Sequence, residues 1–232
     1  ENSEACFIVS ETINFHELSC LEILGNGVIK RIDFGLTISS GSPFWPLIRI
    51  HDIRNVFFHG QWSVDGNRDN QEYSVSIFRG NYCFRHNGDV EIINYEPSVN
   101  IRIENHCYLN SYLNSLVLWN CTNAKVSNVS FIDTTWNGIS GTSLTNFQVD
   151  SCYFIRCGAS DIYNTSEKQG DRAGIQLREL PQDLVFSMEG FPEGDDAFIK
   201  AGKVNTNITI ANSDFDSCGV ESIYVEPHNP YR

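Results

Sequence analysis

The chain has 232 residues, of which 41% are hydrophobic and 12% aromatic, and this is typical of a folded globular protein with a sizeable core. Its 29 acidic and 16 basic residues give a net charge of −13 at pH 7. This charge argues against a nucleic-acid partner, because nucleic-acid-binding surfaces are basic. The longest apolar stretches, such as SLVLW at residues 115–119, are far too short to cross a membrane. The first residue is Glu1 rather than Met, so we expect a fragment or a processed product.

Two loose copies of a repeat come first in the chain. The segment CLEILGNG begins at Cys20 and centres on Ile23. A second copy begins at Asn55, with Phe58 as its apolar anchor and Ile77 as a later apolar position.

Five clearer copies of the repeat follow. They read NIRIENHCYL, NAKVSNVSFI, NFQVDSCYFI, DLVFSMEGFP and NITIANSDFD, and they begin at Asn100, Asn123, Asn146, Asp183 and Asn207. The fourth residue of each copy is an apolar anchor, and the residue five positions later is aromatic: Tyr108, Phe131, Phe154, Phe191 and Phe215. Another apolar residue stands thirteen positions after each anchor: Leu116, Ile139, Ile162, Ile199 and Ile223.

The period of the repeat predicts how the copies pack. Apolar and polar residues alternate within the copies, and this two-residue period is typical of β-strands. The anchors Ile103, Val126 and Val149 recur at a constant interval. A unit of this length cannot bury its apolar face alone, so neighbouring units must stack. We therefore expect one all-β domain over residues 1–232, a single-stranded parallel β-helix with coils of about 23 residues and loop inserts, in which the aromatic residues pile up inside.

The eight cysteines contain no CxxC motif. In the predicted register Cys157 and Cys218 share a column but lie two coils apart, with Gly194 between them. That spacing, roughly 9 to 10 Å, is too long for a disulfide. We therefore expect free thiols, which require no oxidising compartment.

Two inserts interrupt the predicted coils, at about residues 79–97 and 164–182, and both follow the strand that carries the later apolar position. The first contains Asn87-Gly88 between two strand-like runs, which favours a β-hairpin. Inserts of a stacked fold collect on one side, so two loops here would wall a groove along that strand. The alternatives are loops that only decorate the surface or that meet a neighbouring subunit.

Residues beside the later apolar position should point outward. Tyr163, Lys200 and Tyr224 form a predicted ladder on three successive coils, with Phe198 and Glu226 beside it and Arg178 in the second insert. Aromatic rings, hydroxyls and a cation suit sugars, which offer apolar CH faces and many hydroxyl groups. The alternative is ordinary cross-strand packing of exposed aromatics.

Carboxylates cluster next to this ladder. Asp195 and Asp196 are adjacent, and Asp196 lies one predicted coil from Asp161, at an estimated Cα separation of roughly 8 Å. Hydrolysis of a glycosidic bond needs an acid and a base, about 6.5 to 9.5 Å apart in inverting enzymes and about 5 to 5.5 Å in retaining ones. Repulsion between Asp195 and Asp196 would raise one pKa, as a proton donor requires. A solvated turn and a calcium site are alternatives.

The asparagine-apolar-x-apolar pattern, VDGN at residues 64–67 and SIYVEP at residues 222–227 resemble the right-handed parallel β-helix superfamily of pectate lyases, polygalacturonases and phage tailspikes. The resemblance covers about residues 20–228 and implies a right-handed helix. GDDAFIKAG, from Gly194, is similar to a segment of polygalacturonase-type glycoside hydrolases, which would make Asp195 and Asp196 the catalytic pair and place Asp161 near a third aspartate. The Gly-His-Gly of that family is absent, which favours a tailspike-like hydrolase.

Residues and resemblance together predict an endo-acting glycoside hydrolase that binds and cleaves a bacterial surface polysaccharide. The catalytic candidates are Asp161, Asp195 and Asp196, and we expect no cofactor and no metal. By resemblance to tailspikes, the protein would be an extracellular or virion-associated homotrimer. Alternatives are a non-catalytic adhesin, a structural spike, or a lyase in which Lys200 or Arg178 abstracts the proton.

Overall fold

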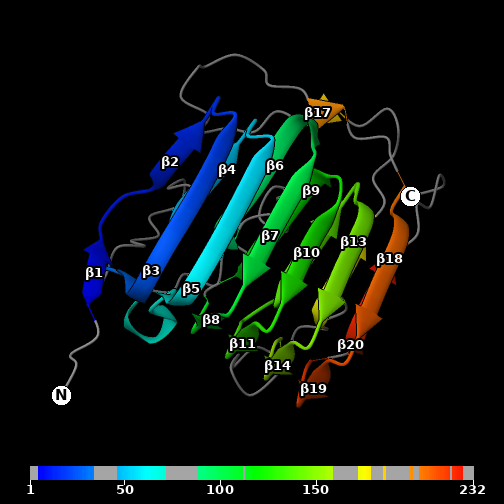
Figure 1. Ribbon diagram of the computed structural model, residues 1–232. Helices are drawn as coiled ribbons and strands as arrows, with labels where there is room; N and C mark the ends of the chain where they lie inside the picture. Colours follow the sequence, from blue (N-terminus) through cyan, green and yellow to red (C-terminus); the bar gives the residue numbers. More distant parts are fainter. Residues whose placement is uncertain are drawn as a thin grey trace.

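The computed structural model describes residues 5–33, 46–71, 88–111, 113–158, 172–178, 185–186, 199–200, 204–219 and 221–226. These residues form two large sheets of parallel strands, one two-stranded antiparallel pair and a single 3-10 turn, Arg68–Asn70 (Figure 1). The prediction of an all-β protein with parallel strand pairing is therefore confirmed. Within the described part of the chain, no helix has the length and apolar character needed to span a membrane.

The first sheet has eleven strands. Its members are β1 (Cys6–Val9), β3 (Cys20–Arg31), β5 (Asn55–Asp65), β7 (Asn100–Glu104), β8 (His106–Leu109), β10 (Ala124–Ser127), β11 (Ser130–Ile132), β13 (Thr145–Asp150), β14 (Tyr153–Ile155), β18 (Thr206–Ala211) and β19 (Asp214–Asp216). Figure 1 shows the long strands of this sheet side by side in chain order, from β3 in blue to β18 in orange.

The second sheet has seven strands in the order β2-β4-β6-β9-β12-β15-β20. Its members are β2 (Ile13–His16), β4 (Ile48–His51), β6 (Gly88–Ser98), β9 (Asn114–Cys121), β12 (Ile139–Thr142), β15 (Ala173–Arg178) and β20 (Glu221–Glu226). From β7 onward, each repeat places two strands in the first sheet and then one in the second, as in β7, β8 and β9. In the two earlier repeats a single long strand, β3 or β5, takes the place of the two.

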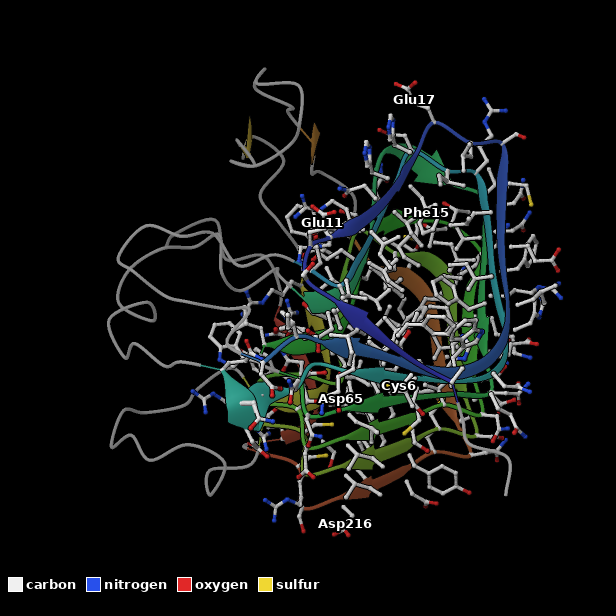
Figure 2. The ribbon with its side chains drawn as sticks, turned by 90° about the vertical axis from the view of Figure 1, so that its left-hand side faces the viewer. Cys6, Glu11, Phe15, Glu17, Asp65 and Asp216 are labelled. Carbon is white, nitrogen blue, oxygen red and sulfur yellow. The ribbon has the colours of Figure 1, made fainter. Side chains whose placement is uncertain are left out.

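The apolar core lies between the two sheets. Alternate residues of β7 and β10, such as Ile101, Ile103 and Val126, are fully buried, while the residues between them face outward. Figure 2 views the stack along its axis and shows Phe15 pointing into this interior, whereas Glu17 points away from it. The two-residue alternation of the sequence thus decides which side chains form the core.

Successive repeats stack in register, as predicted. Ile103 pairs with Val126, and Val126 pairs with Val149. The looser copies are in the same register, because Ile23 pairs with Phe58 and Phe58 pairs with Ile103. The position predicted for Ile77 is filled by Val90, which pairs with Leu116. Ile77 itself lies outside the described residues.

The predicted aromatic pile is confirmed for four of its rings. The ring centroids are 5.0 Å apart for Tyr108 and Phe131, 4.8 Å for Phe131 and Phe154, and 4.7 Å for Phe154 and Phe215, with nearly parallel planes. At these spacings no ring fits between Phe154 and Phe215. The prediction that Phe191 belongs to the column is therefore wrong, although Phe191 itself lies outside the described residues.

The segment predicted as the fourth clear repeat is not a stacked coil. β13 pairs directly with β18, so that Val149 is opposite Ile210. The anchor assigned to that repeat, Phe186, lies in β16 (Val185–Phe186), which pairs antiparallel with β17 (Ile199–Lys200). The column of later apolar residues is also corrected. Ile175, and not Ile162 or Ile199, stands between Ile139 and Ile223, because Ile139 pairs with Ile175 and Ile175 pairs with Ile223.

The same correction applies to the two cysteines that were predicted to lie two coils apart. β14 pairs directly with β19, so no coil separates the strands that precede Cys157 and Cys218. The spacing that excluded a disulfide between them is therefore wrong.

The two predicted inserts overlap strands of the seven-stranded sheet. Residues 88–97 of the first belong to β6, whose two edges pair in parallel with β4 and β9. The predicted hairpin at Asn87-Gly88 is therefore not formed by this strand. Residues 173–178 of the second insert form β15. Parts of both segments that were predicted to be loops are therefore strands of the seven-stranded sheet, β6 and β15.

Asparagine columns fix the turns between repeats. The amide of Asn146 donates to Asn123 Oδ1 at 2.8 Å, and that of Asn207 donates to Asn146 Oδ1 at 2.9 Å. Asn105 lies at the bend between β7 and β8, and Asn128 lies at the equivalent bend between β10 and β11. Both have positive φ, 61° and 53°. Asparagine adopts this left-handed conformation with little strain and bonds the neighbouring turn.

Candidate functional site: the outer face of the seven-stranded sheet

The seven-stranded sheet carries two rows of side chains that face away from the core, which we call the outer face. The first row, in register, is Asn14, Arg49, Glu91, Val117, Ser140, Gln176 and Tyr224. The second row includes His16, His51, Trp119, Thr142 and Arg178. Adjacent strands in these rows are separated by the spacing of parallel strands, about 4.8 Å.

The middle of the outer face is polar and yet buried. Glu91, Ser140 and Gln176 are fully buried, and Trp119 and Arg178 are 2% and 5% exposed. The end of the face at β20 is more open, because Tyr224 is half-buried. Buried polar groups are costly unless they are paired, so their partners define the chemistry of the face.

Glu91 is held by Arg49 of the adjacent strand β4. The two residues are direct register partners, and Arg49 Nε donates to Glu91 Oε2 at 3.0 Å. The backbone N–H of Gly88 donates to the other carboxylate oxygen at 3.2 Å. Burial raises the pKa of Glu91 above its ordinary value, against the opposing effect of the Arg49 guanidinium.

Asp89 lies two residues before Glu91 on the same side of β6. It accepts a 2.7 Å hydrogen bond from Arg31 Nη2 of β3, and both side chains are fully buried. Burial raises the pKa of Asp89 and lowers that of Arg31, against their mutual attraction. Gly66 makes room for this carboxylate, because a Cβ at that position would collide with Asp89 Oδ2.

Gln176 and Arg178 form the polar part of the face on β15. With its carbonyl oxygen turned toward the guanidinium, Gln176 accepts from Arg178 Nη2 at 2.7 Å and from Nε at 3.0 Å. Asn137, two residues before β12, joins the two neighbouring strands. Its amide donates to Asn114 Oδ1 of β9 at 2.8 Å, and its carbonyl oxygen accepts from the Ala173 N–H of β15 at 2.8 Å. This network fixes the start of β15 against β9 and holds Arg178 in place.

Three of the positions predicted to bind substrate are brought together by the register of this sheet. Arg178 of β15 is the register partner of Glu226 of β20, and Gln176 is the partner of Tyr224. Lys200 lies instead in β17, opposite Val185. The predicted ladder from Lys200 to Tyr224 is therefore not formed, because Gln176 occupies the neighbouring position.

The remaining predicted site residues, Asp161, Tyr163, Asp195, Asp196 and Phe198, lie outside the described residues. Their roles stay predictions. The estimated separation of Asp161 and Asp196 assumed that each belongs to a coil of the stack. Since β13 pairs directly with β18, that estimate has lost its basis.

Sequence reasoning missed Asp89, Glu91 and Trp119 as members of the outer face. The signal was present in GDVEII, residues 88–93, where Val90 and Ile92 alternate with the two carboxylates. The Asn-Gly pair before it led to a hairpin interpretation instead. Among the residues that the structure describes, no three histidine, cysteine or acidic side chains are grouped so that they could hold a metal ion.

Comparisons with known proteins add little to this geometry. No protein-family model matches the chain, and no curated protein matches it. One solved structure with a measurable likeness is described as a "putative glycosyl hydrolase" from Parabacteroides merdae. The alignment has 13% identity and a TM-score of 0.40, and it covers 91% of this chain and 81% of that one. A likeness of this degree establishes neither family nor function.

Proposed function

We propose that the chain is a single-stranded right-handed parallel β-helix that binds and hydrolyses a polysaccharide along the outer face of its seven-stranded sheet. The observation that carries the proposal is the pair of rows that cross successive strands of this face. They bring Trp119, Arg178 and Tyr224 onto one surface with Glu91 and Gln176. Aromatic rings offer a face for sugar CH groups, and amide, carboxylate and guanidinium groups can bond sugar hydroxyls.

An acid held neutral by its surroundings can donate a proton to a glycosidic oxygen. Burial shifts the pKa of Glu91 in this direction, while its ion pair with Arg49 opposes the shift. Asp161, Asp195 and Asp196 remain the candidates for the complementary carboxylates. The middle of the outer face is buried, so a polymer would contact the face first at its more open end, at Tyr224 of β20.

The test is to incubate the protein with a panel of bacterial surface polysaccharides and to measure new reducing ends. We expect cleavage of at least one polymer. Glu91→Gln and Asp196→Asn should each lower kcat by at least about 100-fold, the usual contribution of general acid–base catalysis. Asp214→Asn is the matched control, because Asp214 is an exposed carboxylate of the other sheet and its loss should leave cleavage unchanged.

Other outcomes would replace the proposal with one of its alternatives. Glycan binding without new ends would indicate an adhesin, and no binding to any polymer would indicate a structural spike. A product that carries a new carbon–carbon double bond, detected by its ultraviolet absorbance, would indicate a lyase.

The resemblance to tailspikes extends the proposal to a homotrimer that acts outside the cell or on a virion. Its support is the sequence resemblance alone. A solution mass of three chains by light scattering is the expected result, and a monomer would contradict it.

A further inference from the structure

Cys157 and Cys218 occupy the same position in consecutive repeats. Each stands three residues after a stacked ring, Phe154 or Phe215. The preceding repeats carry Ser111 and Thr134 at this position. The strands before the two cysteines are paired in register, with Phe154 opposite Phe215, and the N–H of Gly219 donates to the Cys157 carbonyl at 2.8 Å. The two cysteines are therefore direct neighbours along the stack.

Their spacing suits a disulfide. Neighbouring parallel strands lie about 4.8 Å apart, and the Cα atoms of disulfide-bonded cysteines are usually about 4.4 to 6.8 Å apart. Both side chains point the same way, because Cys157 Sγ lies 3.4 Å from the Phe131 carbonyl and Cys218 Sγ lies 3.4 Å from the Phe154 carbonyl. The two side chains also interact with each other, which shifts the pKa of both thiols.

We propose that Cys157 and Cys218 are an oxidation site, at which a low-molecular-weight disulfide such as oxidised glutathione links the two repeats covalently. The sulfur of Cys218 attacks the glutathione disulfide, forms a mixed disulfide and releases one glutathione thiol. Cys157 then attacks the Cys218 sulfur, the protein disulfide forms, and the second glutathione leaves as a thiol. Two protein thiols are oxidised while one glutathione disulfide is reduced, so atoms and electrons balance.

The surroundings of the two sulfurs assign their order in this reaction. Cys218 is half-buried, whereas Cys157 is fully buried, so Cys218 is the sulfur that a solute reaches first. Interaction with the Cys157 side chain lowers the pKa of Cys218, while burial raises that of Cys157. A thiolate is the attacking species in thiol–disulfide exchange, which makes Cys218 the first nucleophile and Cys157 the resolving thiol.

The new bond would close a segment that borders the outer face. Residues 158–217 lie between the two cysteines and include β15, which carries Gln176 and Arg178. Oxidation would therefore tie the last two described repeats together next to the proposed polysaccharide surface. The oxidation itself does not depend on that proposed function.

The test equilibrates the folded protein with oxidised glutathione, alkylates the remaining thiols and maps the peptides by mass spectrometry. We expect a linked peptide pair that contains Cys157 and Cys218. In Cys157→Ser the pair is absent, and Cys218 carries a glutathione adduct. Serine suits this position, because Ser111 already occupies the same column.

Cys152→Ser is the matched control. Cys152 is buried in the neighbouring column, where the adjacent repeats carry Val129 and Ser213 and no thiol. This variant should form the linked pair as the unaltered protein does. The proposal is wrong if Cys157 and Cys218 stay alkylatable while the exposed Cys6 and Cys20 react, or if either cysteine is linked to another partner instead.

Discussion

At the scale of single residues, the described structure concentrates its unusual electrostatics in buried polar side chains. His106 begins β8 and is 5% exposed, and its ring is packed edge-on against Phe58, with centroids 5.5 Å apart. Burial lowers the pKa of His106 to about 4, although the backbone groups of Asn105 and Gly60 favour the charged ring. The next repeat carries the buried Val129 at the same position. This position in the stack therefore favours an uncharged side chain.

This lowered pKa predicts a pH-dependent stability. The unfolded chain binds a proton at His106 near pH 6.5 and the folded protein only near pH 4. The unfolded state therefore holds more protons at this group between these values, and the contribution of His106 to the free energy of unfolding should fall as the pH is lowered from 7 to 4, opposite in sign to the contributions of Asp89 and Glu91. The loss from this group is at most about 3 kcal/mol. Urea unfolding across this range measures it.

His106→Val supplies the comparison, because valine fills the equivalent position of the next repeat. The variant should be less stable at pH 7 but should lose less stability on acidification than the unaltered protein. Equal pH slopes for the two proteins would show that His106 is not buried as described.

At the scale of strands, glycines in or beside the second sheet pack directly against the stacked aromatic rings of the first, because they have no side chain to occupy that space. Gly138, which precedes β12, has no room for a side chain: a Cβ there would lie 2.8 Å from both Phe154 Cδ1 and the Gly174 carbonyl oxygen. Gly174 of β15 stands in the same relation to the next ring, because its Cβ would lie 2.6 Å from Phe215 Cδ1.

We therefore expect Gly138→Ala to destabilise the fold by about 1 to 3 kcal/mol, as overpacking of a close-packed core usually does. Thr209→Ala is the control, since Thr209 is exposed on β18 and surface changes are usually within about 0.5 kcal/mol. Denaturant midpoints of the two variants test the expectation. A change in the slope m would instead point to a changed denatured state, and equal midpoints would contradict the packing argument.

The elements also show what could and could not be predicted before the structure. Alternation and the regular period predict the register of Ile103, Val126 and Val149, because identical columns must stack to bury apolar faces. They fail at Phe186 and Ile199, which have the same apolar spacing but pair antiparallel. A few alternating apolar residues fit either a stacked strand or a hairpin, and only long-range pairing decides between them.

The candidate site was predictable in part for the same reason. Regular alternation in β20 predicts that Tyr224 points outward, whereas Arg178 could be assigned only to an insert and not to a strand. Glu91 and Asp89 were missed, since a local turn signal outweighed the alternation around Val90 and Ile92. Their raised pKa values arise from burial against strands and turns distant in the chain, which no local pattern encodes.

At the scale of the whole molecule, the stack is a series of repeats that each contact their neighbours, so a covalent link between two repeats restrains everything between them. The link between Cys157 and Cys218 would close a loop of about 60 residues, for which the chain-entropy relation gives about 4 kcal/mol of stabilisation before any strain in the folded state. The oxidised protein should therefore unfold at a higher guanidinium concentration than the reduced one.

The difference should disappear when a reductant is added and should be absent in Cys157→Ser. It should persist in Cys152→Ser, whose column contains no second thiol. Equal midpoints for the oxidised and reduced proteins would contradict this expectation. Either the reduced chain would already keep the two repeats together in its denatured ensemble, or strain from the bond in the folded state would cancel its effect on the unfolded chain. Because neighbouring strands here share one register from Tyr153 to Ile155 with Asp214 to Asp216, we expect little strain and a clear shift.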